Sequence, residues 1–540
     1  MASVKCRPGS RFWIGGLPAW RDQDGIDRAS EDAVPSLLQP GRNCSLVTTA
    51  SRFALLVDGS SYYETLAECI RRARRTVALV GWDLDTRVRL GPSGGGGPLP
   101  PSLCEFLRSV AAANPELHIY ISTWSFPALF ANVRDPKLVL GQDPFDHPRI
   151  HLTFDDRHPP GGSHHQKIVV IDDCLAFAGG MDLAGGRWDT PEHRPDDARR
   201  AGKDGPYPSS HDVQAMVDGD AARALSGIVR DRWHRASETP MAAPAEPWDA
   251  WPSAVPPDAI DAPVGISRTD IDSGGCRDVE RLHLDLLDAA RASIYIENQY
   301  LTSPLITTAL CRRLEAPDGP EIVLVLPLTN TGWLEQNTIE ALRAHSINQL
   351  RAADRFERLR ICYPIVPGPG DGAVGVHSKV AVIDDRLFRV GSSNLTSRSM
   401  GLDTECDLTI EAATPEHRAA VRRLRNLLLA EHLGMSVDDV DTVLSADPSL
   451  VRLVDARRAN PRHLRELPRE EVEVAPMIAR DLVDPSGPVT AGGLVEGIAQ
   501  SVAEQPARRL LPAVLVGVAA AGLVYLLVRR LRATSARPTR

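Results

Sequence analysis

The chain contains no pair of cysteines in a CxxC arrangement, and its cysteines are scattered over 540 residues. Cysteine-based zinc sites and disulfide frameworks need cysteines at short, regular spacings or in even numbers, so neither is indicated. An odd number of dispersed thiols fits a reducing compartment better than an oxidising one. The nine cysteines are Cys6, Cys44, Cys69, Cys104, Cys174, Cys276, Cys311, Cys362 and Cys406.

Excess positive charge is also missing. The formal net charge is −9, so no basic field covers the whole molecule, and this disfavours a nucleic-acid partner. The stretch Met1–Gly16 lacks the apolar run of a signal peptide. A length of 540 residues is nevertheless enough for two domain-sized units with cores of their own.

One short pattern occurs twice in the chain. Ser163–Asp172 and Gly375–Asp384 both contain His-x-Lys, then four residues, then Asp. After six further residues come Gly179–Asp182 in the first copy and Gly391–Asn394 in the second, both beginning with small residues and ending in a polar one. Two histidines repeated in register indicate that both act on one atom.

The residues after each His-x-Lys are apolar and mostly β-branched, which predicts a buried strand returning as a hairpin. Residues i and i+2 of a strand face the same way, so His165 points with Lys167, and His377 with Lys379. Asp172 and Asp384 complete the two catalytic motifs. They stand at the strand ends, where an aspartate is better placed to hold a turn than to touch a substrate.

The elements before the two motifs follow the same order. Strands are predicted at 76–82 and 293–300, and again at 150–154 and 360–365, with helices between them. His165 and His377 are 212 residues apart, and Thr76 and Ser293 are 217 apart. We therefore predict a duplicated α/β fold with two α/β/α halves, in which helices cover mostly parallel or mixed sheets and the halves share one active site.

The domain organisation follows from these repeats and from changes in composition. A Pro- and Ala-dense stretch between the halves is predicted to form no regular structure. The predicted parts are a lead-in (1–40), the first half (41–237), a Pro-rich linker (238–265), the second half (266–435), a short helical extension (436–465), a tether (466–509), a transmembrane helix (510–528) and a basic tail (529–540).

The segment Leu510–Val528 has 19 residues without a charge and is bracketed by arginine pairs. A bilayer core needs roughly 20 apolar residues in a helix, so a single-pass C-terminal membrane anchor is expected, in preference to a buried terminal helix. Five arginines after the segment would place the tail in the cytoplasm, whereas the unpaired cysteines favour a cytoplasmic catalytic region. The expectation adopted is a tail anchor with the catalytic domain on the cytoplasmic side.

Two histidines and two lysines brought together suit a reacting anion. The lysines can supply charge to the non-bridging oxygens of a phosphodiester. One imidazole can attack phosphorus while the other protonates the leaving oxygen, through a phosphohistidine intermediate. Because the cationic side chains supply the positive charge, neither a metal nor another cofactor is expected.

Histidines in such a role need carboxylates that fix their tautomer. Asp212 and Glu405 each precede an alternating strand pattern downstream of a motif, and both are candidates. The alternative is that they are solvated strand ends or caps.

The chain resembles the phospholipase D superfamily, whose signature is a doubled HxKxxxxD followed by a small-residue loop. The likeness extends over about residues 40–435 and includes Ile296–Tyr300, Gly186–Thr190 and Arg398–Glu405. The resemblance implies that the two motifs form one site between the halves. It also implies roles for the site residues: His165 as nucleophile, His377 as general acid/base, Lys167 and Lys379 as phosphate ligands, and Asn394 and Asp182 as further polar contacts. Asp182 departs from the usual Asn or Ser.

The leading functional hypothesis is a phospholipase D that hydrolyses glycerophospholipids such as phosphatidylcholine and transfers the phosphatidyl group to alcohols. A cardiolipin-synthase-type phosphatidyltransferase is the main alternative, followed by a phosphodiesterase or nuclease and by an inactive binding protein. The expected partners are a phospholipid substrate and a membrane reached through the C-terminal helix. No nucleic acid and no protein partner is predicted.

Overall fold

The computed structural model describes residues 35–92, 100–125, 135–139, 142–202, 205–272, 274–329, 333–368, 370, 372–469 and 484–488. The chain divides into a small unit, Met1–Ser36, and a large one, Leu37–Arg540. Only residues 35 and 36 of the small unit are described, and everything below concerns the large one.

Two sets of seven strands form the sheet of the large unit. The first set contains β1 (Leu46–Val57), β2 (Thr76–Gly81), β3 (His118–Trp124), β4 (Ile150–Asp155), β5 (Ile168–Ile171), β6 (Leu175–Gly179) and β10 (Val213–Asp218). The second contains β11 (Ala259–Asp270), β13 (Ser293–Glu297), β14 (Glu321–Val325), β15 (Leu359–Ile365), β17 (Val380–Ile383), β18 (Leu387–Gly391) and β19 (Glu405–Glu411).

The two sets have the same topology. From the centre outward the first reads β1-β10-β6-β5-β2-β3-β4, and the second reads β11-β19-β18-β17-β13-β14-β15. In both, the last three strands are parallel and the remaining neighbours are antiparallel. β1 and β11 pair antiparallel, which joins both halves into one sheet; β12 (Cys276–Arg277), beside β11, and β20 (His463–Glu466), beside β15, bring it to 16 strands. The duplicated α/β fold predicted from the repeat is therefore observed.

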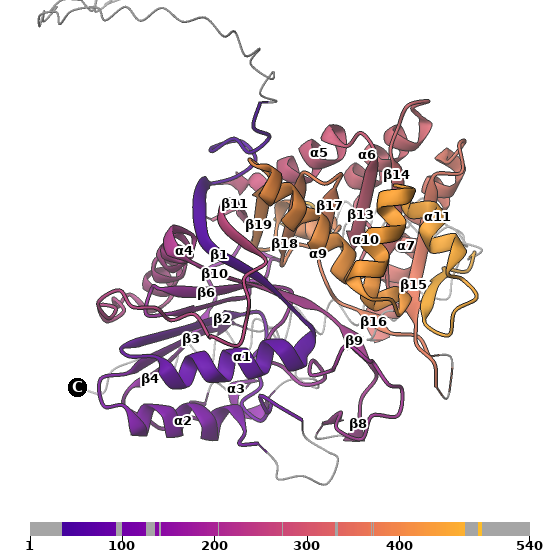
Figure 1. Cartoon of the computed structure of the whole chain (residues 1–540). Coiled ribbons are helices and arrows are strands. Elements are labelled where there is room, and N and C mark those ends of the chain that lie inside the picture. Colours follow the sequence, from indigo (N-terminus) through magenta and orange to yellow (C-terminus); the bar gives the residue numbers. More distant parts are fainter. Residues whose placement is uncertain are drawn as a thin grey trace, which may run out of the picture. The chain divides into compact units, whose positions relative to one another are not determined.

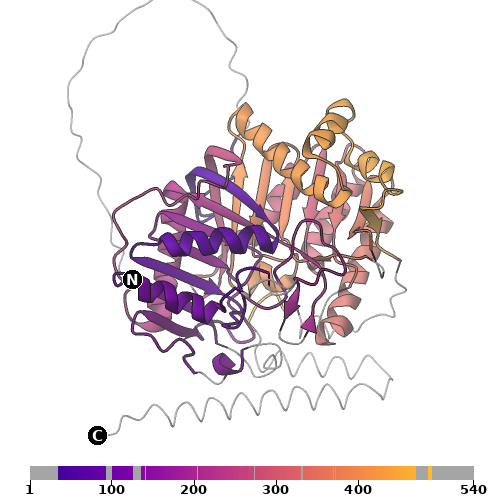
Figure 2. The same ribbon diagram turned by 60° about the horizontal axis from the view of Figure 1, so that its bottom comes forward.

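Helices cover both faces of the sheet in each half (Figures 1 and 2). In the first half, Val77 and Leu79 of β2 pack in the same core as the first two helices, whereas Ala78 and Val80 pack with α4. This alternation is what a strand buried on both faces requires. The helices are α1 (Asp58–Arg72), α2 (Leu103–Ala113) and α4 (Gly219–Ser237) in the first half, and α5 (Asp278–Ala289), α6 (Pro304–Glu315), α7 (Trp333–Ala353) and α9 (Pro415–Leu433) in the second.

Short elements complete the described structure. Two of them, β9 and β16, pair in parallel and connect the two halves, and this ladder lies beside the catalytic motifs. The short elements are β7 (Ala201–Gly202), β8 (Gly205–Pro206), β9 (Ser210–His211), β12 (Cys276–Arg277), β16 (Gly375–Val376), β20 (His463–Glu466), α3 (Pro136–Val139), α8 (Ser397–Gly401), α10 (Val437–Ala446) and α11 (Leu450–Ala456).

The predicted linker is partly a strand. β11 begins at Ala259, inside the range 238–265 that was expected to be irregular. Pro263 is tolerated because it lies just before Val264, where pairing with β19 begins, so its missing N–H interrupts no ladder on that side.

The expected transmembrane helix and the single-pass C-terminal anchor are corrected here. Among the described residues, no helix combines the length and the apolar character that crossing a bilayer requires. The longest ones, such as α4 and α9, carry several charged residues along their length. The stretch 510–528 itself lies outside the described residues. The described part of the chain thus forms the pair of α/β/α halves, and none of its helices is a membrane span.

Candidate active site

The two His-x-Lys segments dock onto opposite halves. Each lies directly before the first strand of a hairpin, β5–β6 in the first copy and β17–β18 in the second. The backbone N–H of His165 donates to the carbonyl of Thr404 at 3.0 Å, just before β19. The N–H of His377 donates to the carbonyl of His211 at 2.8 Å, in β9. Each motif is therefore held by the half that does not contain it.

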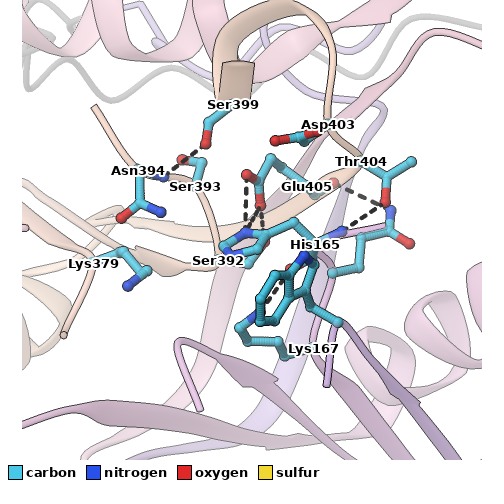
Figure 3. Close-up of polar contacts among 12 residues, drawn as sticks. His165, Lys167, Lys379, Ser392, Ser393, Asn394, Ser399, Asp403, Thr404 and Glu405 are labelled. Carbon is cyan, nitrogen blue, oxygen red and sulfur yellow. Dashed lines mark hydrogen bonds and ion pairs between the residues drawn. The ribbon is translucent and has the colours of Figure 1, made fainter. Parts of the chain in front are cut away.

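The orienting carboxylates are crossed in the same way. His165 Nδ1 lies 3.0 and 3.1 Å from the two carboxylate oxygens of Glu405, a buried residue of the second half (Figure 3). His377 Nδ1 lies 2.6 Å from Asp212 Oδ2, in the first half. A proton on Nδ1 facing a carboxylate leaves the lone pair on Nε2, which is the atom available for chemistry. Asp212 and Glu405 thus occupy the position expected of orienting groups, rather than that of solvated strand ends.

The small residues after each motif make room for these carboxylates. A Cβ at Gly180 would lie 2.2 Å from Asp212 Oδ1, so only glycine fits at this position. In the second half, the hydroxyl of Ser392 donates to Glu405 instead. The loop composition noted in the sequence is therefore a packing requirement of the acid–base pairs.

The two lysines are not equivalent. Lys167 Nζ forms an ion pair with Asp182 Oδ2 at 2.9 Å, and both side chains are buried. Lys379 Nζ donates to the amide oxygen of Gln299 at 3.2 Å and to the carbonyl of His377. The residue equivalent to Asp182 is Asn394, which is neutral. Asp182 therefore offsets the charge of one lysine, while the other faces neutral acceptors.

Asn394 lies close to Lys379 (Figure 3). Its backbone N–H donates to Ser399 Oγ at 3.1 Å, whereas its side-chain Oδ1 is buried without a hydrogen-bond partner. Buried polar atoms are rarely left without a partner, so Asn394 Oδ1 is a candidate substrate contact.

Burial and the surrounding cations keep both histidines neutral. Burial, then Lys167 and Lys379, hold the pKa of His165 well below its ordinary value. Burial, then Arg187 and Lys379, do the same for the pKa of His377. A neutral imidazole is the form that can act as a nucleophile. The His165 side chain is 16% exposed and that of His377 9%, so His165 is the more accessible.

Burial also shifts two partner groups toward neutrality. It raises the pKa of Glu405 to about 7 and lowers the pKa of Lys379 to about 7. Both groups therefore titrate close to physiological pH.

Asp172 and Asp384 hold the turns of their hairpins. The carboxylate of Asp172 accepts the backbone N–H groups of residues 74, 75 and 76 at 2.7 to 2.8 Å, and the indole N–H of Trp248 at 3.0 Å. Asp384 accepts the N–H groups of residues 291 to 293. Both have positive φ, 51° and 53°, in the left-handed region that aspartate tolerates. They are placed as the sequence predicts, at the strand ends.

We expect Asp172→Asn to destabilise the protein by roughly 2–4 kcal/mol, because an amide cannot accept four buried donors as a carboxylate does. Chemical denaturation monitored by circular dichroism measures the change. The matched control is Asp173→Asn, since that side chain is 24% exposed and pairs only at the surface with Arg230. A variant of normal stability that has lost all activity would instead place Asp172 in the chemistry.

Sequence reasoning missed two features of the site. Arg187 was noticed only as part of a motif, yet its charge acts on His377, Asp212 and Lys379, and its Nε is buried without a hydrogen-bond partner. The second is a group of buried histidines and carboxylates that could hold a metal: Asp58, His193, His211, Glu297, Glu431 and His432. We call it the His–carboxylate cluster. Apart from the neighbours Glu431 and His432, its members are far apart in sequence, and they follow no recognised spacing pattern.

The chain is similar to several known proteins. A family model described as "Cardiolipin synthase, PLD-like domain" matches residues 283–426. Phospholipase D alpha 1 of Carica papaya is 22% identical, with 71% of this chain and 65% of the relative covered. Phospholipase D A of Dictyostelium discoideum is 27% identical, with 64% of this chain and 32% of the relative covered. The chain thus spans less than two thirds of the length of either relative.

The family model and these relatives support the resemblance to the phospholipase D superfamily found in the sequence. The solved structures that match include a phosphatidylserine synthase of Haemophilus influenzae, which is 15% identical in sequence. The match has a TM-score of 0.49 and covers 76% of this chain and 96% of that chain. The matching structures also include Nuc, a phospholipase D family member of Salmonella typhimurium, at 18% identity and a TM-score of 0.23, with 31% and 91% covered.

Proposed function

We propose that this chain is a phospholipase D, which hydrolyses glycerophospholipids such as phosphatidylcholine to phosphatidate and a free headgroup, and transfers the phosphatidyl group when an alcohol replaces water. The observation that carries the proposal is the crossed arrangement, in which the Nδ1 atom of each motif histidine meets a carboxylate of the other half. We also propose that the halves 41–237 and 266–435 act as one catalytic unit.

In the first step, the Nε2 lone pair of His165 attacks phosphorus and the bond from phosphorus to the headgroup oxygen breaks. His377 gives a proton to that oxygen. In the second step, His377 takes a proton from water or an alcohol, whose oxygen attacks phosphorus and releases His165. Glu405 stabilises the charge that develops on His165, because its carboxylate already lies 3.0 Å from Nδ1.

The cations around the site are suited to the phosphoryl oxygens. Lys379 and Arg187 are the best placed to contact the substrate, because the charge of Lys167 is already offset by Asp182. A bound phosphodiester would offset the same cations that keep His377 neutral in the free site. Substrate binding would therefore raise the pKa of His377 and allow it to take up the proton that it gives to the leaving group.

We expect kcat/KM to follow a bell-shaped pH profile centred near pH 7. Below that pH, Glu405 becomes protonated, since its pKa is raised to about 7, and the charge that supports His165 is lost. Above it, Lys379 loses its proton, since its pKa is lowered to about 7. Initial rates between pH 5 and pH 9 on a soluble substrate measure the profile.

Two variants assign the limbs of that profile. Glu405→Gln should flatten the acid limb, and Lys379→Arg should move the alkaline limb upward, because a guanidinium keeps its charge. Limbs that stay unchanged in both variants would contradict the assignment.

A cardiolipin-synthase-type phosphatidyltransferase is the second candidate, supported by the description of the family model that matches residues 283–426. It would use the same histidines with phosphatidylglycerol as acceptor. A nuclease or other phosphodiesterase remains a third candidate, and the net charge of −9 disfavours it.

Product analysis distinguishes these candidates. The purified full chain is given phosphatidylcholine or phosphatidylglycerol vesicles, with and without a short primary alcohol. Phosphatidate, and phosphatidyl-alcohol when alcohol is present, would support the phospholipase. Cardiolipin formed from phosphatidylglycerol alone would favour the synthase. Cleavage of DNA without turnover of lipid would overturn the proposed substrate while leaving the family assignment intact.

A further inference from the structure

The His–carboxylate cluster lies next to Asp212, the carboxylate that meets His377, and brings both halves together. Asp58 begins α1, His211 lies in β9, and Glu431 lies near the end of α9 (Figure 1). His193 comes from the loop between β6 and β7. The side chains of Asp58 and His211 are fully buried, and those of His193 and Glu431 are at most 8% exposed. Ionisable groups this deeply buried need partners of opposite charge or a metal.

Four of these side chains direct ligand atoms toward a common point. Glu431 Oε1 lies 2.9 Å from His193 Nε2 and 2.8 Å from His211 Nδ1. Asp58 faces the same point. Its Oδ1 lies 3.2 Å from His211 Nδ1, and its Oδ2 lies 3.5 Å from His193 Nε2. The ligand atoms of all four residues lie within 4.8 Å of one another.

The opposite nitrogen of each imidazole is held by an outer carboxylate. His193 Nδ1 lies 2.9 Å from Asp189, which Arg200 in turn binds at 2.9 Å. His211 Nε2 lies 3.0 Å from Glu297. An imidazole that donates one N–H outward presents a lone pair inward, and this is how metal-binding histidines are oriented in proteins.

Two atoms that face the common point lack a normal hydrogen bond. Asp58 Oδ2 and His211 Nδ1 are completely buried, and neither has a hydrogen-bond partner of acceptable geometry. Asp58 also has a φ of 64°, an uncommon conformation for a residue with a side chain. Strained and unsatisfied groups of this kind gather where a ligand is held.

We infer that Asp58, His193, His211 and Glu431 form a binding site for one divalent transition-metal ion of the zinc class. Metal–ligand bonds of ~2.0–2.1 Å in a tetrahedron place the ligand atoms about 3.3 Å apart. Four separations between these residues, 2.8, 2.9, 3.2 and 3.5 Å, lie around that value; the last two are measured from different oxygens of Asp58, and all four ligand atoms lie within 4.8 Å of one another. Two imidazoles and two carboxylates form a nitrogen–oxygen ligand set that suits zinc.

Two protons could neutralise the cluster in place of the metal, and the test must distinguish the protonated cluster from the metal-bound one. If both imidazoles are doubly protonated, they neutralise Asp58 and Glu431 just as a divalent ion would. Without a metal, and despite the opposing effect of burial, Asp58 and the other carboxylates raise the pKa of His193 to about 9. The two atoms without a hydrogen-bond partner, Asp58 Oδ2 and His211 Nδ1, favour the metal, since a protonated His211 would donate from Nδ1 along an ordinary hydrogen bond. The hydrogen bond between His193 Nε2 and Glu431 fits either state.

A closed four-ligand site has a structural role rather than a catalytic one. The N–H of Asp58 donates to the carbonyl of Asp212 at 2.8 Å, and the N–H of Asp212 lies 3.4 Å from Asp58 Oδ1. His211 is the residue before Asp212. The ion would thus fix the segment that carries the Asp212 carboxylate to His377, whichever lipid is the substrate.

Metal analysis of the full chain tests the inference. The protein is stripped with a chelator and titrated with zinc or cobalt. We expect one ion per chain, a rise in Tm of several degrees on adding zinc, and the visible spectrum of tetrahedral cobalt. His193→Gln and Glu431→Gln should lose the ion. The matched control, His417→Gln, changes another buried histidine of α9 outside the cluster and should keep it.

A His165→Ala/His377→Ala double variant should still bind one ion, which separates this site from the catalytic histidines. If the cluster variants fail to fold, the wild-type titration alone decides. The absence of stoichiometric binding to the wild type would overturn the inference and leave the protonated network in its place. Undiminished binding by folded His193→Gln, or loss of binding in the double variant, would also overturn it.

Discussion

His165→Ala should lower the turnover of a phospholipid by about 10⁴–10⁶-fold, the range seen when a covalent nucleophile is removed. No other group on the described structure can replace it, because His377 is held by Asp212 for proton transfer. Initial rates of headgroup release measure the loss. Labelling with a phosphate-radiolabelled lipid, followed by a quench that preserves phosphohistidine, should show no covalent intermediate.

The adjacent histidine provides a stringent control for this result. His164 is buried, and its Nε2 lies 3.1 Å from Asp155 Oδ1, away from the Glu405 carboxylate. His164→Gln should lower stability but keep the turnover of folded protein within about tenfold of wild type, since it removes packing and two polar contacts, with Asp155 and Thr404. Equal losses in both variants would contradict the assignment of His165 as the nucleophile.

His377→Ala should block turnover at a different point. Without a proton donor, an ordinary headgroup leaves slowly, and we expect a loss of about 10³–10⁵-fold, somewhat above that for a typical acid–base group because both steps depend on it. A phosphatidyl ester of p-nitrophenol has a leaving group that needs no protonation, so His165 should still react once. The intermediate should then accumulate, because no base activates water.

A burst of one p-nitrophenolate per active site, with the phosphatidyl group found on His165, is the expected outcome. Peptide mapping by mass spectrometry locates the modified histidine. Label on His377 in the His165→Ala variant would reverse the two roles.

Much of this site could be predicted from sequence, because its chemistry is repeated in register. The period-two strand pattern placed His165 beside Lys167, and the two flanking hairpins are observed where it placed them. Asp212 and Glu405 were recognised as candidate carboxylates because each precedes a strand downstream of a motif. Local patterns such as these predict the structure well because both faces of the strands are buried.

The crossed pairing was beyond that reasoning. Which carboxylate meets which histidine depends on how β1 and β11 join the halves, and these strands are 213 residues apart at their first residues. The same holds for Asp182, expected beside the substrate but paired with Lys167, and for the His–carboxylate cluster. Contacts between residues that are distant in sequence produce no periodic pattern that could be recognised.

Two expectations from composition were less reliable than those from motifs. The proline-dense range 238–265 was predicted to be irregular, but pairing with β1 overrides proline content from Ala259 onward. The membrane anchor was inferred from an uncharged stretch and the arginine pairs around it, and the described helices contain no span. Composition reports the average preference of a segment, whereas tertiary contacts decide its structure.

The crossed carboxylates have a consequence for protein engineering by recombination. A chimera that takes its first half from one relative and its second half from another combines His165 with a foreign Glu405, and His377 with a foreign Asp212. The unit that must be inherited together is therefore not a contiguous half, but a histidine with the carboxylate about 165 or 240 residues away along the chain. Shuffling breakpoints placed between the halves, although they spare every strand, separate both pairs at once.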